Sequence, residues 1–243
     1  MYFHVLDQNQ EGKMPPHGVA LQFAPVRIRA LLSTDYGHRQ ILKLGYYERR
    51  LSSHIARLAK NGGVLIDVGA NIGYFTMIWL ALNPCNRAYA FEPSRRNFSM
   101  LRENLLSVRS PERAELFNCA LGAESGLSNF HLGPPDQTGW GGLSKSQSAV
   151  KVQVRRLDEV IPAGINVDVL KIDTEGADSW VIKGAERLLR EKSIKSVYFE
   201  INQARMSSLG IKDGEAQDFL EALDYSVEQL ETSLFKAVPN PTS

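Results

Sequence analysis

The chain has 243 residues, of which 43% are hydrophobic and 23% charged, and its formal net charge is +1 at pH 7. This is the composition of an ordinary globular domain, and the small net charge gives no electrostatic reason to bind nucleic acid or an anionic membrane. The two cysteines, Cys85 and Cys119, are too few and too far apart for a disulfide scaffold or a clustered zinc site. No apolar leader and no run of about 18 apolar residues occurs, so we expect a cytoplasmic protein without a membrane span.

Charge is distributed unevenly along the chain. Residues 27–60 carry eight Lys or Arg against two acids, whereas residues 213–231 carry seven acids and no Lys or Arg. Two solvated helix faces of opposite sign account for this pattern, because short runs of like charge are usually exposed. The alternative is a basic mouth that attracts an anionic substrate.

Helical and extended patterns alternate along most of the chain. Gly and Pro mark residues 1–20 as a loosely structured lead-in, and residues 122–157 are an interruption rich in Gly, Ser and Thr. Apolar residues at helical spacing predict helices over residues 47–60, 72–82, 94–106, 177–190 and 215–223. Short apolar runs predict strands over residues 64–68, 88–91, 115–119, 127–132, 149–155, 167–172, 196–201, 226–230 and 234–238.

This alternation predicts a doubly wound α/β fold, with a mostly parallel sheet and helices on both faces, because parallel strands need helical crossovers. The last two strands have no helix between them, which predicts a hairpin and an antiparallel strand near the C-terminus. We expect residues 1–45 to be an N-terminal extension and residues 46–243 to be the main domain. In open sheets of this kind ligands bind beyond the carboxyl ends of the strands, so functional residues are expected there.

The sequence DVGANIG, which begins at Asp67, follows the first long apolar strand. Gly69 permits a sharp turn from strand to helix, and Gly73 permits the helix to approach a ligand or strand closely. A dinucleotide site has the pattern G-x-G-x-x-G, but Asn71 and Tyr74 occupy its second and third glycine positions. A ligand with an amino-acid end and no phosphate suits this loop better. Its ammonium would reach Asp67, and its carboxylate would meet N–H groups at the helix start.

The next two strand ends also carry polar residues. Glu92, in the sequence FEP, stands where a carboxylate accepts hydrogen bonds from two ribose hydroxyls, and Pro93 fixes the turn. Asn118, Cys119 and Ala120, in the sequence NCALG, stand where an adenine ring would rest, or form an ordinary β-turn. Together with the first loop, Glu92 describes a nucleoside with a free ribose and no pyrophosphate. This description fits S-adenosylmethionine.

Two acids, Asp173 and Glu175, end the buried strand of the sequence LKIDTEGA, and they would point to the same side of an extended chain. Burying both is costly unless a sulfonium, a substrate hydroxyl or a metal meets them, and acids capping a helix N-terminus are the structural alternative. Glu200, at the end of the next strand, points to the same rim. These oxygens suit Mg²⁺, but no Asp-Asn pair follows the strand, so magnesium is not supported by the sequence.

The four segments together resemble the FkbM-type methyltransferases. The similarity extends over about residues 46–230 and includes the sequence KGA downstream of the fourth segment. The resemblance implies a seven-stranded class I methyltransferase fold and methyl transfer from S-adenosylmethionine to oxygen, often a hydroxyl of a sugar or natural product. It also implies which residues line the cofactor site, namely Asp67, Gly69, Asn71, Glu92, Asn118 and Asp173, with Glu48 in the sequence YYE matching an acid before the first strand. Thr174 and Asp178 depart from the Val and Glu that are common in such proteins.

Methyl transfer from a sulfonium is an in-line displacement, so positioning and the exclusion of water supply most of the catalysis. A hydroxyl acceptor also needs a base for its proton, and Asp173 and Glu175 are the candidates. His131 is a third candidate because its ordinary pKa suits the task, although a structural role on a half-buried strand is the alternative. The Gly-rich residues 133–148 form either a mobile lid over a small-molecule acceptor or an exposed surface loop.

Two other functions fit parts of the pattern. A nicotinamide-dependent oxidoreductase is disfavoured by Asn71 and Tyr74, which break the pyrophosphate pattern. A non-catalytic binding module of the same fold is the second alternative. Base N-methylation is disfavoured, because DTEG stands where such enzymes carry an Asn/Asp-Pro-Pro-aromatic segment.

Overall fold

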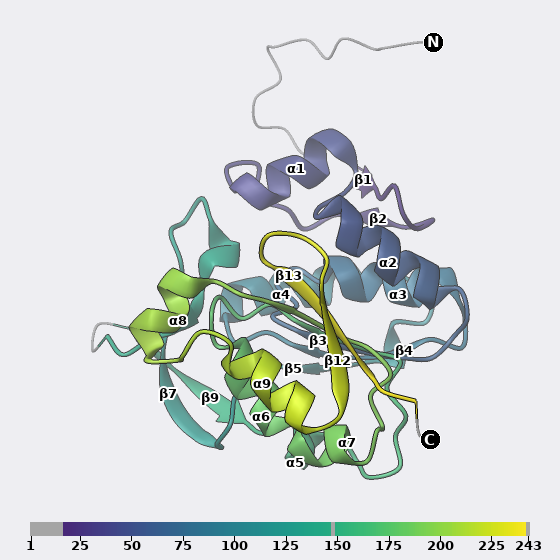
Figure 1. The fold of residues 1–243 in the computed structure, drawn as a ribbon. Helices are drawn as coiled ribbons and strands as arrows, with labels where there is room; N and C mark the ends of the chain where they lie inside the picture. The colour runs from purple at the N-terminus through teal and green to yellow at the C-terminus, as the bar shows by residue number, and fades with distance from the viewer. Residues whose placement is uncertain (1–16, 147–148, 242–243) are drawn as a thin grey trace.

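Seven strands form a central sheet through the middle of the molecule in the computed structural model, which describes residues 17–146 and 149–241 (Figure 1). From one edge to the other they are β12 (Tyr225–Gln229), β13 (Leu234–Pro239), β11 (Val197–Glu200), β10 (Val169–Ile172), β3 (Val64–Val68), β4 (Arg87–Phe91) and β5 (Ala114–Phe117). The chain passes outward from β3 to β4 and β5 on one side, and from β10 to β11 on the other. The topological switch point therefore lies between β3 and β10.

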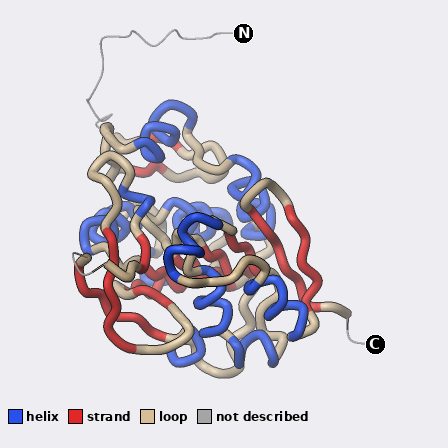
Figure 2. Tube along the Cα trace, turned by 60° about the vertical axis from the view of Figure 1, so that its left-hand side comes forward, coloured by secondary structure: helices blue, strands red, loops and turns tan. Residues whose placement is uncertain are grey.

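The strands from β5 to β11 pair in parallel, whereas β13 is antiparallel to both β11 and β12. In the register between β3 and β10, Lys171 lies opposite Asp67 and Ile172 opposite Val68, so both strands end at the same edge. The strands of the closing hairpin lie beside the C-terminus (Figure 2). The mostly parallel α/β fold with an antiparallel strand near the C-terminus is confirmed.

Helices cover both faces of this sheet (Figure 1). One layer contains α2 (Arg49–Ala59), α3 (Tyr74–Leu82) and α4 (Arg95–Leu105). The other contains α5 (Leu157–Val160), α6 (Asp178–Gly184), α7 (Glu186–Arg190) and α9 (Glu215–Ala222). Successive strand residues face opposite layers, so Leu65 belongs to the first hydrophobic cluster and Ile66 to the second.

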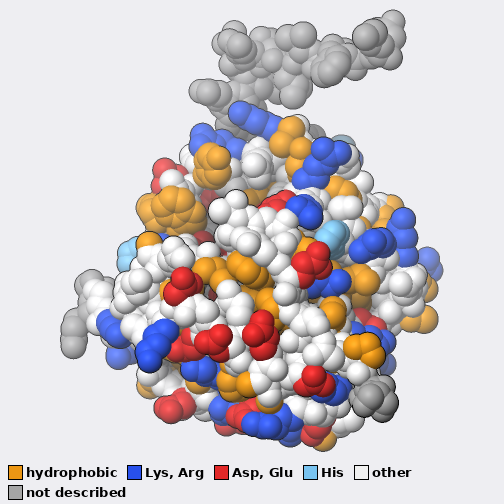
Figure 3. Space-filling model, viewed as in Figure 1, with side chains coloured by type: hydrophobic (Ala, Val, Ile, Leu, Met, Phe, Trp, Pro, Cys, Tyr) orange, Lys and Arg blue, Asp and Glu red, His pale blue; other side chains and the backbone are white. Residues whose placement is uncertain are grey.

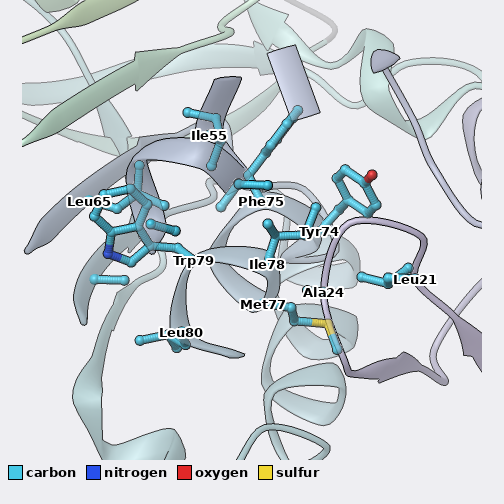
Figure 4. Packing of buried hydrophobic residues seen from close by; sticks show 14 of the residues in the cluster. Leu21, Ala24, Ile55, Leu65, Tyr74, Phe75, Met77, Ile78, Trp79 and Leu80 are labelled. Carbon is cyan, nitrogen blue, oxygen red and sulfur yellow. The ribbon is translucent and has the colours of Figure 1, made fainter. Parts of the chain in front are cut away.

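Helix α3 fills the centre of the first cluster. Phe75, Ile78 and Trp79 are buried, and they pack near Ile55 of α2 and Leu65 of β3 (Figure 4). Burial of side chains this large stabilises the fold by about 1.5–3 kcal/mol each. This packing explains why an almost wholly apolar segment, with little amphipathic character, forms a helix here.

Residues 17–45 pack on the same cluster rather than standing apart from it. They form a two-stranded ribbon, β1 (Val19–Ala20) and β2 (Arg27–Ile28), followed by α1 (Tyr36–Leu44). Ile28 and Ile41 belong to the cluster that holds α3. Asn104 of α4 ties the segment down, because its Oδ1 accepts the N–H of Ala30 at 2.6 Å and its Nδ2 donates to the carbonyl of Ile72 at 2.9 Å. Residues 1–16 of the expected extension lie outside the described residues.

The interruption after β5 forms a second, smaller sheet. Its order is β6 (Ala120–Leu121), β9 (Val150–Arg155), β7 (Gly126–His131) and β8 (Gly142–Leu143). The two strands expected in this region are confirmed as β7 and β9, which pair antiparallel. The turn η2 (Thr138–Trp140) lies between β7 and β8.

Several elements differ from the sequence prediction. The helix expected over residues 177–190 is two helices, because the N–H of Ala185 bonds to the carbonyls of Ile182 and Lys183 instead of continuing one regular helix. Helices α1 and α8 (Gln203–Leu209) and the turn η1 (Pro111–Arg113) were not predicted. For α1 the signals were present, since Asp35 caps its first turn and Gly45 ends it at a φ of 72°. Among the described residues no helix is both long and apolar enough to span a membrane.

Candidate active site

A cavity opens at the carboxyl ends of β3, β4 and β10, at the switch point of the sheet. We call its strand-end side the floor, which consists of Gly69, Lys171, Asp173, Glu175 and Glu200. The opposite side, formed by residues 35–41 of the α1 segment and residues 137–141 of the loop after β7, we call the roof. The position agrees with the place where open α/β sheets bind ligands.

The floor begins with a close approach between two strand ends. Gly69 has a φ of 72°, and a Cβ atom there would lie 1.8 Å from the carbonyl oxygen of Asp173. Only glycine meets both conditions, because the conformation is left-handed and the space is already occupied by backbone. Gly73 does not line the cavity: a Cβ there would lie 2.5 Å from Leu101 of α4, so this glycine permits the packing of two helices.

Asp67 lies beneath the floor and is fully buried. Its Oδ2 accepts a hydrogen bond from the Thr76 hydroxyl at 2.7 Å, and its Oδ1 lies 3.4 Å from Nζ of Lys171. Asp67 is absent from the cavity lining, and its contact with the ligand ammonium stays a prediction. Its charge is already matched by Lys171, which itself lines the cavity.

Lys171 lines the cavity but was not among the site residues predicted from the sequence. Its side chain is buried, and its Nζ lies 3.4 Å from Oδ2 of Asp173. The same Nζ donates a hydrogen bond to the carbonyl of Gly69 at 3.1 Å and lies over the ring of Phe75. Desolvation alone would lower the pKa of Lys171, but the charges of Asp173 and Asp67 raise it above its usual value. A lysine inside a buried apolar strand was the available signal, since such a charge must be paired.

Carboxyl groups outnumber Lys171 on the cavity wall. Burial, reinforced by the charge of Asp173, raises the pKa of Glu175 to about 7. The same two causes raise the pKa of Glu48 to about 7 and that of Glu200 to about 9. Glu175 is held by Asn202, whose Nδ2 donates to its Oε2 at 3.2 Å. The wall is therefore rich in carboxyl groups, and the pKa values of Glu48, Glu175 and Glu200 lie well above the ordinary range.

The backbone holds two of these carboxyls in unusual conformations. Glu48 has a φ of 40° and Glu175 a φ of 55°, both in the left-handed region that side chains rarely adopt. Such strain concentrates at functional sites, where the surrounding structure imposes it. Asp178 supports the second turn, because it accepts the N–H of Thr174 at 3.0 Å and the N–H of Glu200 at 2.8 Å. It thus joins the ends of β10 and β11 without lining the cavity.

Glu92 stands at the end of β4 and is buried at the cavity wall. Its Oε1 accepts the N–H of Ser94 at 2.8 Å and its Oε2 the N–H of Asn71 at 2.9 Å. Burial, only partly offset by these two hydrogen bonds, raises the pKa of Glu92 to about 7. The neighbouring Pro93 also lines the cavity.

The residues after β5 divide into two roles. Cys119 and Ala120 are buried and line the cavity. Asn118 is exposed and does not line it; its Nδ2 donates to the carbonyls of Glu92 at 2.8 Å and Pro93 at 3.2 Å. Asn118 therefore supports the turn that carries Glu92.

The roof is fastened by hydrogen bonds between distant segments. Asp35 Oδ1 accepts the N–H of His38, and its Oδ2 accepts the N–H of Thr138 at 2.6 Å. Asn97 of α4 donates to the carbonyl of Thr138 at 3.2 Å, and Arg205 of α8 donates to the carbonyl of Trp140 at 3.0 Å. Residues 137–141 and Leu143 of the expected lid line the cavity, and residues 147 and 148 lie outside the described residues; the role of the loop as a lid stays a prediction.

His131 is not part of this site. Its side chain on β7 is exposed, its Nδ1 accepts the N–H of Gly133 at 3.0 Å, and it is absent from the cavity lining. The strand that carries it turns the neighbouring Phe130 inward instead, because successive residues of a strand face opposite sides. His131 is therefore withdrawn as a candidate base.

The basic residues of the 27–60 segment do not form a mouth to the cavity. Among the described residues that line it, Lys171 is the only Lys or Arg. Lys and Arg side chains are visible instead on the outer surface around the N-terminal segment (Figure 3). No group of three or more His, Cys, Asp or Glu within the described ranges is arranged to hold a metal ion.

Comparison with known proteins agrees with this architecture. The Methyltransferase FkbM domain model matches residues 67–227. The 2-O-methyltransferase NoeI of Sinorhizobium fredii is 30% identical over 181 residues, which cover 67% of this chain and 68% of that protein. The 31-O-demethyl-FK506 methyltransferase FkbM of Streptomyces tacrolimicus is 34% identical over 96 residues, covering 40% of this chain and 36% of that protein. The chain therefore belongs to the FkbM family of methyltransferases.

Proposed function

We propose that the protein transfers a methyl group from S-adenosylmethionine to a hydroxyl oxygen of a small molecule. The observation that carries the proposal is the cavity at the switch point, which is lined both by Glu92, the candidate for binding ribose, and by the acidic residues of the floor. The chain that forms this cavity belongs to the FkbM family. Methylation of oxygen is supported by the name of the relative from Sinorhizobium fredii, a 2-O-methyltransferase. Neither a nicotinamide-dependent oxidoreductase nor a non-catalytic module has comparable support.

The residues of the cavity suit this cofactor. Asn71 Oδ1 is buried without a hydrogen-bond partner among the described residues, which is costly unless a ligand satisfies it. Glu92 offers its carboxylate to ribose hydroxyls, and Cys119 with Ala120 offers an apolar surface to adenine. Asp173 lines the cavity and offers a cationic group a carboxylate, whose Oδ2 also lies 3.4 Å from Nζ of Lys171. When bound, the cofactor supplies an electrophilic methyl group on a positively charged sulfur.

Glu175 is the proposed general base. A base works best when its pKa lies near the working pH, and burial places the pKa of Glu175 at about 7. Asn202 holds Oε2, which leaves Oε1 to accept the proton of the acceptor hydroxyl as that oxygen forms its new bond to carbon. Asp173 orients the acceptor and the cationic cofactor, since its pairing with Lys171 keeps it in place.

The acceptor is proposed to be uncharged and to carry an apolar ring face. An acidic wall with one paired lysine disfavours anionic acceptors by like-charge repulsion. Tyr36 and Trp140 line the roof side of the cavity while remaining 62% and 51% exposed. Aromatic side chains at a rim provide flat contact surfaces with little loss of conformational entropy. The loop of residues 133–148 is proposed to open for exchange of substrate and product.

Transfer of labelled methyl from S-adenosylmethionine to fractionated, uncharged hydroxyl compounds tests this function. We expect Glu175→Gln to lower kcat by about 10²–10⁴-fold, because the acceptor proton loses its base. Binding of S-adenosylhomocysteine, measured by calorimetry, should be unchanged. Glu103→Gln, on the exposed face of α4, is the matched control and should behave as wild type. Wild-type kcat in Glu175→Gln would remove the base from the proposal, and absence of any methylated product would refute the function.

A further inference from the structure

His38 of α1 is a buried histidine without an assigned role, and it lines the cavity from the roof. Its Nδ1 accepts the N–H of Leu32 at 3.0 Å. Its Nε2 is buried and has no hydrogen-bond partner among residues 17–146 and 149–241. A buried polar atom left in this way costs about 1–3 kcal/mol unless a ligand or water meets it.

The surroundings fix which nitrogen of His38 carries the proton. A neutral imidazole has one donor and one acceptor nitrogen, and Nδ1 is the acceptor because Leu32 donates to it. Burial lowers the pKa of His38, and this effect exceeds the opposing charge of Asp35, so the ring stays neutral. The oxygens of Asp35 already accept the N–H groups of His38 and Thr138. The proton therefore lies on Nε2, which is a fixed donor.

Two further polar atoms from other segments accompany this donor. Asn97 of α4 and Thr138 of η2 are both buried and both line the cavity. The side-chain Nδ2 of Asn97 donates to the carbonyl of Thr138, which sets the orientation of the amide and leaves Oδ1 as an acceptor. That Oδ1 and the hydroxyl of Thr138 have no partner within the part of the chain that the structure describes. Three segments that line the cavity thus each carry one buried, unpartnered side-chain atom: a donor, an acceptor and a hydroxyl.

This group of atoms adjoins the end of β4. Helix α4, which carries Asn97, is capped by Ser94, and the N–H of Ser94 donates to Glu92. The other oxygen of Glu92 accepts the N–H of Asn71. The side-chain Nδ2 of Asn71 lies close to Gly139 in η2, since a Cβ atom added to Gly139 would be 3.3 Å from it. The segments that carry Asn97 and Thr138 therefore adjoin the turn of Glu92, and His38 lines the same cavity as Glu92.

A hydroxyl group matches this set, because it accepts one hydrogen bond and donates another. An anionic group does not match, because the carboxylate of Glu92 and Oδ1 of Asn97 would both repel it. We propose that His38 Nε2 donates a hydrogen bond to a ribose hydroxyl of S-adenosylmethionine, opposite Glu92, with Asn97 and Thr138 completing the subsite. The inference rests on the proposed function, and it makes the α1 segment a determinant of cofactor affinity.

Calorimetric binding of S-adenosylhomocysteine and of its 2′-deoxy and 3′-deoxy ribose analogues tests the inference. In His38→Phe we expect affinity for S-adenosylhomocysteine to fall about tenfold, the effect of one lost hydrogen bond to a buried donor. His38→Phe should bind one of the two deoxy analogues as tightly as it binds S-adenosylhomocysteine, because the hydroxyl missing from that analogue is the proposed partner of His38. His38→Gln, which retains an N–H donor, should recover part of the affinity. His54→Gln, on α2 away from the cavity, is the control.

Each outcome has a separate meaning. The ribose assignment would be overturned if removal of each ribose hydroxyl lowered the affinity of His38→Phe by the same factor as that of wild type. Unchanged affinity for S-adenosylhomocysteine in His38→Phe would overturn it as well, and a raised acceptor KM in that variant would then assign the donor to the acceptor. If wild type itself binds no S-adenosylhomocysteine, the cofactor proposal fails, and this result is distinguishable from failure of the His38 subsite alone. Thermal unfolding of each variant separates loss of binding from loss of fold.

Discussion

The floor and the roof of the cavity are built in different ways. The floor is charged and comes from the ends of parallel strands, where Gly69, Lys171 and Asp173 contact one another directly. The roof is mostly uncharged and comes from two segments about 100 residues apart in sequence, which Asp35 joins at Thr138, while Asn97 ties Thr138 to α4. The floor therefore belongs to the stable core of the sheet, whereas the roof depends on a small number of hydrogen bonds. Local opening follows such differences in the number of buried contacts.

The largest expected effect is on the floor. Lys171→Met leaves Asp67 buried without its counter-charge, and removal of one partner from a buried ion pair costs about 3–5 kcal/mol. Urea unfolding of the two proteins measures this difference. Lys195→Met is the control, because Lys195 is 65% exposed in its pair with Asp168 and should cost less than about 1 kcal/mol. Equal stability of the two variants would contradict the central place given to Lys171.

The next effect is a pH dependence that originates in the floor and the adjoining wall. The folded-state pKa values of Glu48, Glu92 and Glu175 are raised to about 7 and that of Glu200 to about 9. Raised carboxyl pKa values give stability that is present below the unfolded pKa and is lost as pH rises through the folded pKa. We therefore expect the melting temperature of the ligand-free protein to fall by about 5–10 °C between pH 6 and pH 9.

The Glu200→Gln variant locates this pH dependence. It should flatten the curve between about pH 7 and pH 9, because Glu200, with the pKa of about 9, is the carboxyl that still loses its proton on unfolding in that range. Exposed Glu228→Gln is the matched control and should leave the curve unchanged. A melting temperature that rises with pH over this range would show that these carboxyls are stabilised in their charged form, contrary to the burial argument.

A smaller effect is expected from the roof. Asp35→Asn keeps one acceptor oxygen but loses the second, so either the cap of α1 or the bond to Thr138 breaks, at a cost of about 1–2 kcal/mol. Amide hydrogen exchange should become faster at residues 138–140 with little change in β3 and β10. Asp136→Asn, exposed in the same loop, is the control. Unchanged exchange at residues 138–140 would mean that Asp35 does not fasten the roof.

The smallest effect concerns His131, which lies outside the cavity. Its exposed ring accepts one backbone N–H, so His131→Ala should leave kcat and its pH profile as in wild type. Steady-state methyl transfer across pH 6 to 9 measures this. A loss of the acidic limb of the profile, where a general base becomes protonated, would return His131 to the site and imply that β7 moves when substrate binds.

Much of the fold could be predicted because its signals are local. Buried parallel strands are continuous apolar runs, as in β3 and β10, and Gly69 marks the turn that follows the first of them. The last strand pair, without a helix between its members, indicated the hairpin of β12 and β13. Helix α1 was not predicted because its sequence is mostly polar, although Asp35 and Gly45 mark its ends.

The alternation of strands and helices, the resemblance to the family and the strand ends at which Glu92, Asp173 and Glu175 stand could all be inferred from the sequence, because each depends on neighbours along the chain. The folded arrangement was needed to see that Asp67 pairs with Lys171 beneath the floor, that His131 is exposed, and that His38 and Thr138 line the same cavity. The physical reason is that charge pairing and burial depend on contacts between distant segments. The DVGANIG loop contains an example of each kind. Its turn could be predicted from Gly69, whereas the partner of Asp67 comes from a strand about 100 residues away and required the structure.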